Sequence, residues 1–121
     1  MPQIIQTGGG MFSKGELLRI NPSNNTIESS GNGGRSWVVR CPDRTSYGTF
    51  RDLLLVGNEV LAATSKGIYV SANAARSFSP RCINSSYGDF ISLQDEGSTL
   101  LANTSRGLYY STNGGRSWVR R

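Results

Sequence analysis

Two tyrosine–cation pairs are the residues of this chain whose types and spacing could do chemistry. Tyr47 and Lys66 recur 40 residues later as Tyr87 and Arg106. Aromatic faces stack on sugar rings and cations bind acidic groups, so these four residues are candidate ligand-binding residues. The alternative, which we favour, is that both tyrosines pack between neighbouring units, with the glycine after each one admitting the neighbour.

The absence of histidine restricts the catalysis that the chain could perform. Histidine is the commonest general base, so Ser–His–Asp and Cys–His nucleophiles and histidine-bound zinc are excluded. The glycine-rich segment at 7–10 lacks the Lys–Ser/Thr and the helix of a phosphate loop. We therefore expect a non-enzymatic protein with no cofactor and no metal.

The net charge of +5, from 13 basic and 8 acidic residues, has two interpretations. One is solubility together with ion pairs across the fold. The other is an acidic ligand, such as a sulfated or sialylated glycan or a nucleic acid. No basic run extends beyond Arg120-Arg121 and no nucleic-acid-binding signature is present, which disfavours nucleic acid.

Cysteine usage and the N-terminus bear on the compartment. Cys41 and Cys82 hold equivalent places in successive units, which should set their Cα atoms beyond the ~7 Å limit for a disulfide. Two unpaired thiols, acting as small buried hydrophobes, fit a reducing environment. No signal peptide or membrane span is visible, so we expect a cytoplasmic protein without a membrane partner.

One eight-residue phrase occurs three times. "SGNGGRSW" ends at Trp37, "SANAARSF" at Phe78 and "STNGGRSW" at Trp118, at intervals of 41 and 40 residues. A fixed period of this length indicates a repeat architecture. The second and third units match along most of their length, whereas the first matches only from about Thr26 onward.

Each unit contains short β-rich runs separated by Gly, Asn, Ser and Pro, and no helical periodicity. In the third unit the runs cover 90–94, 99–105, 107–111 and 116–121. Four short strands in about 40 residues make one antiparallel sheet of the kind used as a propeller blade. We therefore predict an all-β fold. Its single repeat domain, 1–121, comprises three four-stranded blades, at about 1–40, 41–81 and 82–121.

The repeated phrase resembles the Asp-box, or BNR repeat, of sialidase and sortilin-like propellers, with Asn in place of the usual Asp. The resemblance implies that the phrase is a structural hairpin turn on the outer rim and not a catalytic motif. The matching residues are Ser30, Asn32, Gly34, Ser36, Trp37, Ser71, Asn73, Ser77, Phe78, Ser111, Asn113, Gly115, Ser117 and Trp118. Ala75 stands where the family has glycine.

Three blades do not close a ring, because propellers have about four to eight. We expect two copies to close a six-bladed ring as a homodimer; a nine-bladed trimer and a part of a longer polypeptide are alternatives. The predicted function is binding of a glycan or another protein. A structural or interaction subunit is the second reading. A sialidase-like hydrolase is the least favoured, because equivalents of its catalytic residues are not identifiable.

Overall fold

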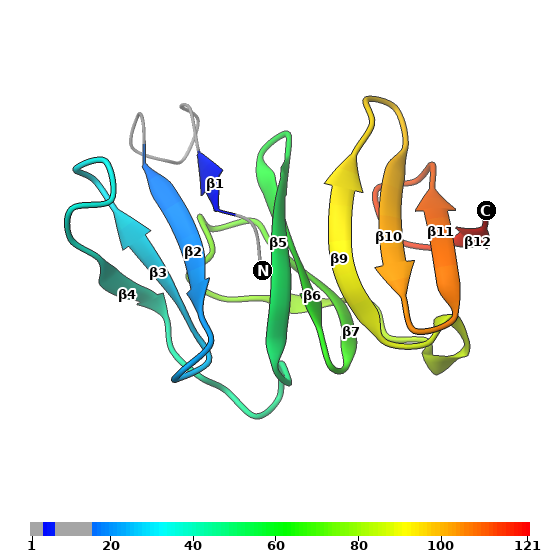
Figure 1. The fold of residues 1–121 in the computed structure, drawn as a ribbon, viewed down its shortest axis with the longest axis horizontal. Coiled ribbons are helices and arrows are strands. Elements are labelled where there is room, and N and C mark those ends of the chain that lie inside the picture. The colour runs from blue at the N-terminus through cyan, green and yellow to red at the C-terminus, as the bar shows by residue number, and fades with distance from the viewer. Residues whose placement is uncertain (1–3, 7–15) are drawn as a thin grey trace.

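The computed structural model describes residues 4–6 and 16–121 of the chain. Three four-stranded antiparallel sheets stand side by side along the longest axis of the molecule (Figure 1). Each sheet is built from one contiguous part of the sequence, and its strands follow one another in chain order. The predicted all-β fold with three four-stranded antiparallel sheets is confirmed.

Each sheet contains four strands. The first contains β1 (Ile5–Gln6), β2 (Leu17–Asn21), β3 (Thr26–Ser30) and β4 (Val38–Cys41). The second contains β5 (Phe50–Val56), β6 (Glu59–Thr64), β7 (Gly67–Ser71) and β8 (Ser79–Cys82). The third contains β9 (Phe90–Asp95), β10 (Leu100–Thr104), β11 (Gly107–Ser111) and β12 (Val119–Arg120), preceded by the 3₁₀ turn η1 (Ser85–Tyr87).

The middle sheet is apolar on both faces because it has a neighbour on each side. Leu53, Val60 and Tyr69 belong to the core shared with the first sheet. Leu61 and Ile68 belong to the core shared with the third. The strands therefore read as nearly continuous hydrophobic runs rather than as an alternation, as in any sheet buried on both faces.

Polar side chains also join each sheet to the next. In the first sheet Arg40 forms an ion pair with Glu16 and donates to the Ala74 carbonyl of the second sheet at 2.7 Å. In the second sheet Arg81 is held by Glu59 at 3.0 Å and donates to the Gly114 carbonyl of the third sheet, also at 3.0 Å. An arginine in the last strand of each of the first two sheets thus donates to a backbone carbonyl in the turn of the next sheet. We call this contact the arginine clamp.

A buried carboxylate adds a second link between the middle and third sheets. Asp52 is 3 % exposed and lies on β5. It accepts the backbone N–H of Leu53 at 3.0 Å and that of Leu93, on β9, at 2.8 Å. A buried carboxylate must be hydrogen-bonded to be tolerated, and here its bonds join two inner strands.

Candidate functional site

The loops that carry Tyr47 and Lys66 lie together at one edge of the second sheet. The backbone N–H of Thr49 donates to the Ser65 hydroxyl at 2.9 Å, and a Cβ on Gly48 would come within 2.9 Å of the Lys66 side chain. Tyr47, however, is only 6 % exposed. Its ring packs inside the core rather than beside the exposed Lys66.

Tyr47 has an internal structural role. Its ring lies 5.7–5.9 Å, centroid to centroid, from Phe50, Tyr69 and Phe78, all in its own blade. Its hydroxyl accepts the backbone N–H of Phe78 at 3.0 Å. The ring therefore contacts aromatic side chains of its own blade, and it lies in the core that the second sheet shares with the first.

The third sheet repeats this arrangement. Tyr87 is half-buried, lies 5.4 Å from Tyr109, and its hydroxyl accepts the Trp118 N–H at 3.3 Å. Arg106 is exposed, and its side chain would approach a Cβ on Gly88 at 2.8 Å. The two cations face solvent, whereas the two tyrosine hydroxyls accept backbone N–H groups of the repeated turns. The four residues therefore do not form a flat aromatic surface on which a sugar ring could stack.

A small pocket lies between these loops at the junction of the second and third sheets. Its volume is 70 Å³, and Lys66, Asn84 and Asp89 are among the residues that line it. Ligand pockets generally occupy about 300 Å³ or more, so this pocket does not accommodate a sugar ring together with its contacts.

The three repeated turns, residues 30–37, 71–78 and 111–118, share one hydrogen-bond network. In the third turn Ser111 Oγ accepts the N–H of Gly115 at 2.9 Å. Asn113 Oδ1 accepts the Ser117 N–H at 3.0 Å, and Asn113 Nδ2 donates to the Ser117 hydroxyl at 2.8 Å. The same bonds recur in the other two turns. Two residues of positive φ follow each asparagine, which explains the Gly-Gly pairs, while Ala74 and Ala75 adopt φ of 65° and 68°.

Replacing Asn113 separates the acceptor role of its side chain from its donor role. Asn113→Ala is expected to lower the free energy of unfolding by about 1–2 kcal/mol, because the Ser117 N–H loses its acceptor. Asn113→Asp should stay within about 0.5 kcal/mol of the unchanged protein, since the Ser117 hydroxyl can turn and donate to the second carboxylate oxygen. Urea unfolding measures both variants, and an aspartate variant as unstable as the alanine variant would contradict this network.

Two sheet faces have no neighbouring sheet among the described residues: the face of the first sheet turned away from the second, and the face of the third sheet turned away from the second. We call them the leading flank and the trailing flank. On the trailing flank, residue positions that a neighbouring sheet buries in the second sheet are exposed to solvent. Ile68 is fully buried, whereas Leu108, at the same strand position in the third sheet, is 37 % exposed. The Arg81 side chain is 8 % exposed and the equivalent Arg121 side chain is 52 % exposed.

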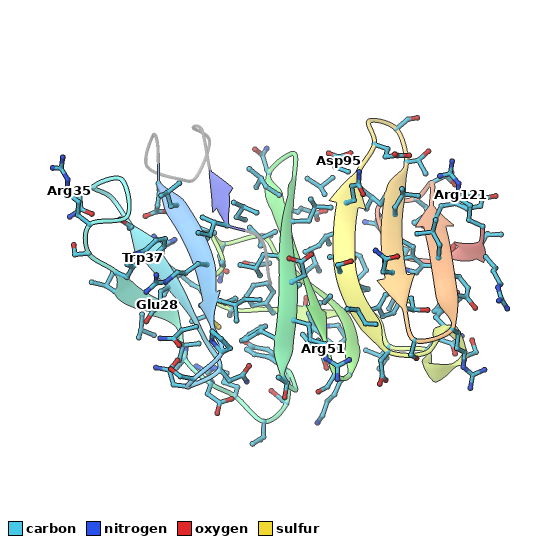
Figure 2. The ribbon with its side chains drawn as sticks, in the orientation of Figure 1. Glu28, Arg35, Trp37, Arg51, Asp95 and Arg121 are labelled. Atoms are coloured by element: carbon cyan, nitrogen blue, oxygen red, sulfur yellow. The ribbon has the colours of Figure 1, made fainter. Side chains whose placement is uncertain are left out.

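The leading flank is more polar than the corresponding faces of the other sheets. Its cross-strand pair Arg19–Glu28 takes the place of Ala62–Tyr69 in the second sheet and Ala102–Tyr109 in the third. Arg19 bonds to Glu28 at 2.8 Å, and its guanidinium lies 4.0 Å above the ring of the half-buried Trp37. Figure 2 shows Glu28 and Trp37 at the first sheet. Charged groups therefore cover part of an aromatic surface that a neighbouring blade covers elsewhere.

The trailing flank shows the same change of character. Gln94 and Asn103 occupy the strand positions held by Leu54 and Ala63 in the second sheet, and both are exposed. A hollow of 340 Å³ opens on this flank, lined by Thr99, Tyr110 and Arg121. Both open faces are thus partly polar.

The Glu28 carboxylate is stabilised in its charged form. The Asn21 amide donates to it at 3.1 Å and lowers its pKa, burial opposes that effect, and Arg19 lowers the pKa further. A carboxyl whose pKa is lower in the folded protein than in the unfolded chain adds stability at pH values above its unfolded pKa. That stability is lost as the pH falls through the folded pKa.

The contribution of Glu28 to stability is therefore expected to depend on pH. Glu28→Gln should lower the free energy of unfolding by roughly 1 kcal/mol at pH 7, with the difference from the unchanged protein shrinking as the pH falls below about 4.5. Denaturant unfolding at a series of pH values measures this difference. A difference that stays constant down to pH 3 would show that charge at Glu28 does not contribute.

The cysteines and the acidic residues provide no reactive or metal-binding cluster in the described part of the chain. Cys41 and Cys82 are free and buried, and burial raises the pKa of each thiol. Within residues 4–6 and 16–121, three or more Cys, Asp or Glu side chains do not gather as metal ligands would. The same residues include no helix with the length and apolarity needed to span a membrane.

Solved structures similar to this chain are β-propellers, which establishes the class of fold. YCF48 from Cyanidioschyzon merolae superposes with a TM-score of 0.63 at 23 % sequence identity, over 89 % of this chain. The GH74 enzyme of Niastella koreensis superposes with a TM-score of 0.58 at 18 % identity, over 87 % of this chain. The three sheets are therefore propeller blades, as the repeat period predicted.

The likeness is confined to the fold. The chain spans 38 % of the length of the YCF48 chain and 17 % of the GH74 chain, so it corresponds to a part of each propeller. No protein-family model matches the chain, and no sequence of a curated protein matches it.

Proposed function

We propose that this chain is a non-enzymatic binding module, a partial propeller that acts through protein–protein contacts made by its two open flanks. Its first partner is a second copy, which completes a six-bladed ring. The observation that carries the proposal is that residues of the third blade are exposed at positions where the second blade contacts its neighbour. Leu108 and Arg121 are open where Ile68 and Arg81 are covered by the next blade.

The polarity of the flanks fits a partner that associates reversibly. Non-obligate interfaces are about as polar as the rest of a protein surface, whereas obligate ones resemble a divided core. Charged and amide side chains such as Arg19, Glu28 and Asn103 keep a separated copy soluble, as the polar outer faces of terminal repeats do in other repeat proteins. A folded single copy and a closed ring should therefore exist in equilibrium.

Trp37 reports whether the leading flank becomes covered. It is half-buried, whereas Trp118 is 4 % exposed, so the Trp118→Phe variant leaves one tryptophan on the flank. Phe78 shows that a turn of this kind accepts phenylalanine. With rising protein concentration, Trp37 emission should shift to the blue and resist quenching by acrylamide. The matched variant Trp37→Phe, which keeps Trp118, should show no change, and an unchanged Trp37 signal would count against the proposal.

A glycan ligand has less support than a protein partner, because Tyr47 and Tyr87 use their hydroxyl groups inside the fold. The exposed Lys66 and Arg106 still offer a cationic loop edge to an acidic group. A glycan array tests this alternative, with Lys66→Ala and Arg106→Ala as variants that leave the core intact. Turnover of a fluorogenic sialoside would instead favour a hydrolase.

The finer assignments belong to the same proposal. The resemblance of the repeated turns to an Asp-box is supported by Asn32, Asn73 and Asn113, whose side-chain oxygens accept the backbone N–H that an aspartate would accept. Two buried free thiols are compatible with the reducing environment of the cytoplasm.

A further inference from the structure

The arginine clamp is present at both junctions inside the chain and is incomplete at both ends. Arg40, Arg81 and Arg121 each stand three residues after the aromatic that closes a repeated turn. The first two donate to the carbonyls of Ala74 and Gly114 in the next blade. In the described residues no blade follows Arg121.

The acceptor that matches Arg121 lies in the first turn. Ala74 and Gly114 are each the first of two residues with positive φ in their turns, at 65° and 75°. Gly33 is the equivalent residue, with φ of 78°, and it is exposed on the leading flank. The trailing flank thus has a guanidinium donor, Arg121, and the leading flank has the matching carbonyl acceptor, Gly33.

The trailing flank already contains a recess where the missing turn would fit. At the junction between the second and third blades, Glu59 holds Arg81, and Arg81 donates to the Gly114 carbonyl. Thr99 and Arg121 occupy the equivalent positions in the third blade, and both line the 340 Å³ hollow. Thr99 has no carboxylate and cannot form the ion pair that Glu59 forms with Arg81. Arg121 instead lies 3.6 Å from the exposed Glu96, and breaking such a surface ion pair costs little free energy.

We infer that the hollow on the trailing flank receives the turn at residues 30–37 of a second copy, with the Arg121 guanidinium donating to the Gly33 carbonyl of that copy. This inference rests on the proposed function and adds the junction that closes the ring. Each copy supplies its trailing flank to one junction and its leading flank to the other, so a two-fold dimer has two identical junctions. The amides of Gln94 and Asn103 face the Arg19–Glu28 pair across each junction, which makes it polar where the internal junctions are apolar.

A matched pair of variants tests the clamp. Arg121→Ala removes the donor, whereas Arg120→Ala removes the same charge from the adjacent exposed residue. Each lost charged hydrogen bond should weaken association about 10- to 100-fold, so the loss at both junctions should raise the dimer dissociation constant about 100- to 10,000-fold, while Arg120→Ala should change it less than about threefold. Sedimentation velocity over a range of concentrations measures the constant, and circular dichroism checks that both variants remain folded.

Hydrogen exchange supplies an independent readout. In the unchanged protein the amides of residues 30–37 should gain protection as the dimer forms, and Arg121→Ala should abolish that gain at the same concentration. If both variants dimerise equally well and protect this turn equally, the clamp is wrong although the proposed function stands. If the unchanged protein stays monomeric at every concentration, both the clamp and the proposed dimer are wrong.

Discussion

Replacing Asp52 with asparagine is expected to lower the free energy of unfolding by about 2–4 kcal/mol. The carboxylate accepts one backbone N–H from its own strand and one from β9 of the next blade. An asparagine has a single oxygen, so its amide group must face one of these donors, leaving a buried N–H without that acceptor. Urea unfolding, followed by tryptophan fluorescence, measures the loss.

Asp89→Asn provides the matched control for this change. The Asp89 side chain is 63 % exposed and lies 3.8 Å from Arg51, a distance typical of a weak surface ion pair. Its replacement should cost less than about 1 kcal/mol. Equal effects of the two variants would show that Asp52 does not join the second and third blades.

Gly67→Ala is expected to be the most damaging single-methyl addition in the middle blade, costing about 3–5 kcal/mol. Gly67 has φ of 133°, and a Cβ there would lie 2.4 Å from the Cys82 carbonyl oxygen and 2.9 Å from Ile83 Cα. Because these atoms belong to the backbone, the outer strand β8 would have to move. Thermal or urea unfolding of the purified variant measures the cost.

Gly107 allows strain to be separated from overlap. It occupies the same position in the third blade with φ of 120°, but a Cβ there would meet only the Arg120 side chain, at 3.7 Å. Gly107→Ala should therefore cost about 1–3 kcal/mol, from backbone strain alone. If Gly107→Ala proves as damaging as Gly67→Ala, contact with the outer strand is not the cause.

The strand arrangement could be predicted from the sequence because the turns carry most of the information. Asn followed by Gly-Gly requires positive φ at two successive residues, and the structure has it at Gly33–Gly34 and at Gly114–Gly115. The period of about 40 residues then fixed four strands per unit, and the third unit follows the predicted runs closely.

The contacts of the two tyrosines could not be predicted from an alternating strand pattern, because Tyr47 lies in a turn and Tyr87 in η1, outside the strands. Tyr47 and Tyr87 bind the N–H groups of Phe78 and Trp118, 31 residues away in each case, and nothing in the local sequence announces such a bond.

The change of character at the flanks could have been found by aligning the three units. Arg19 and Glu28 stand where the other units have alanine and tyrosine, and Gln94 stands where the second unit has Leu54. A charged pair at a position that is otherwise apolar marks the end of a stack or a different kind of junction. The arginine clamp could not be predicted from the sequence, because its acceptors are backbone carbonyls, which every residue has.

The mass of the unchanged protein in solution tests the central claim most directly. Light scattering at increasing concentration should show the mass rising from 13.1 kDa for one chain to a plateau at 26.2 kDa, which is twice that value. A mass that remains at 13.1 kDa into the millimolar range would contradict the ring, as would a mass that grows without reaching a plateau.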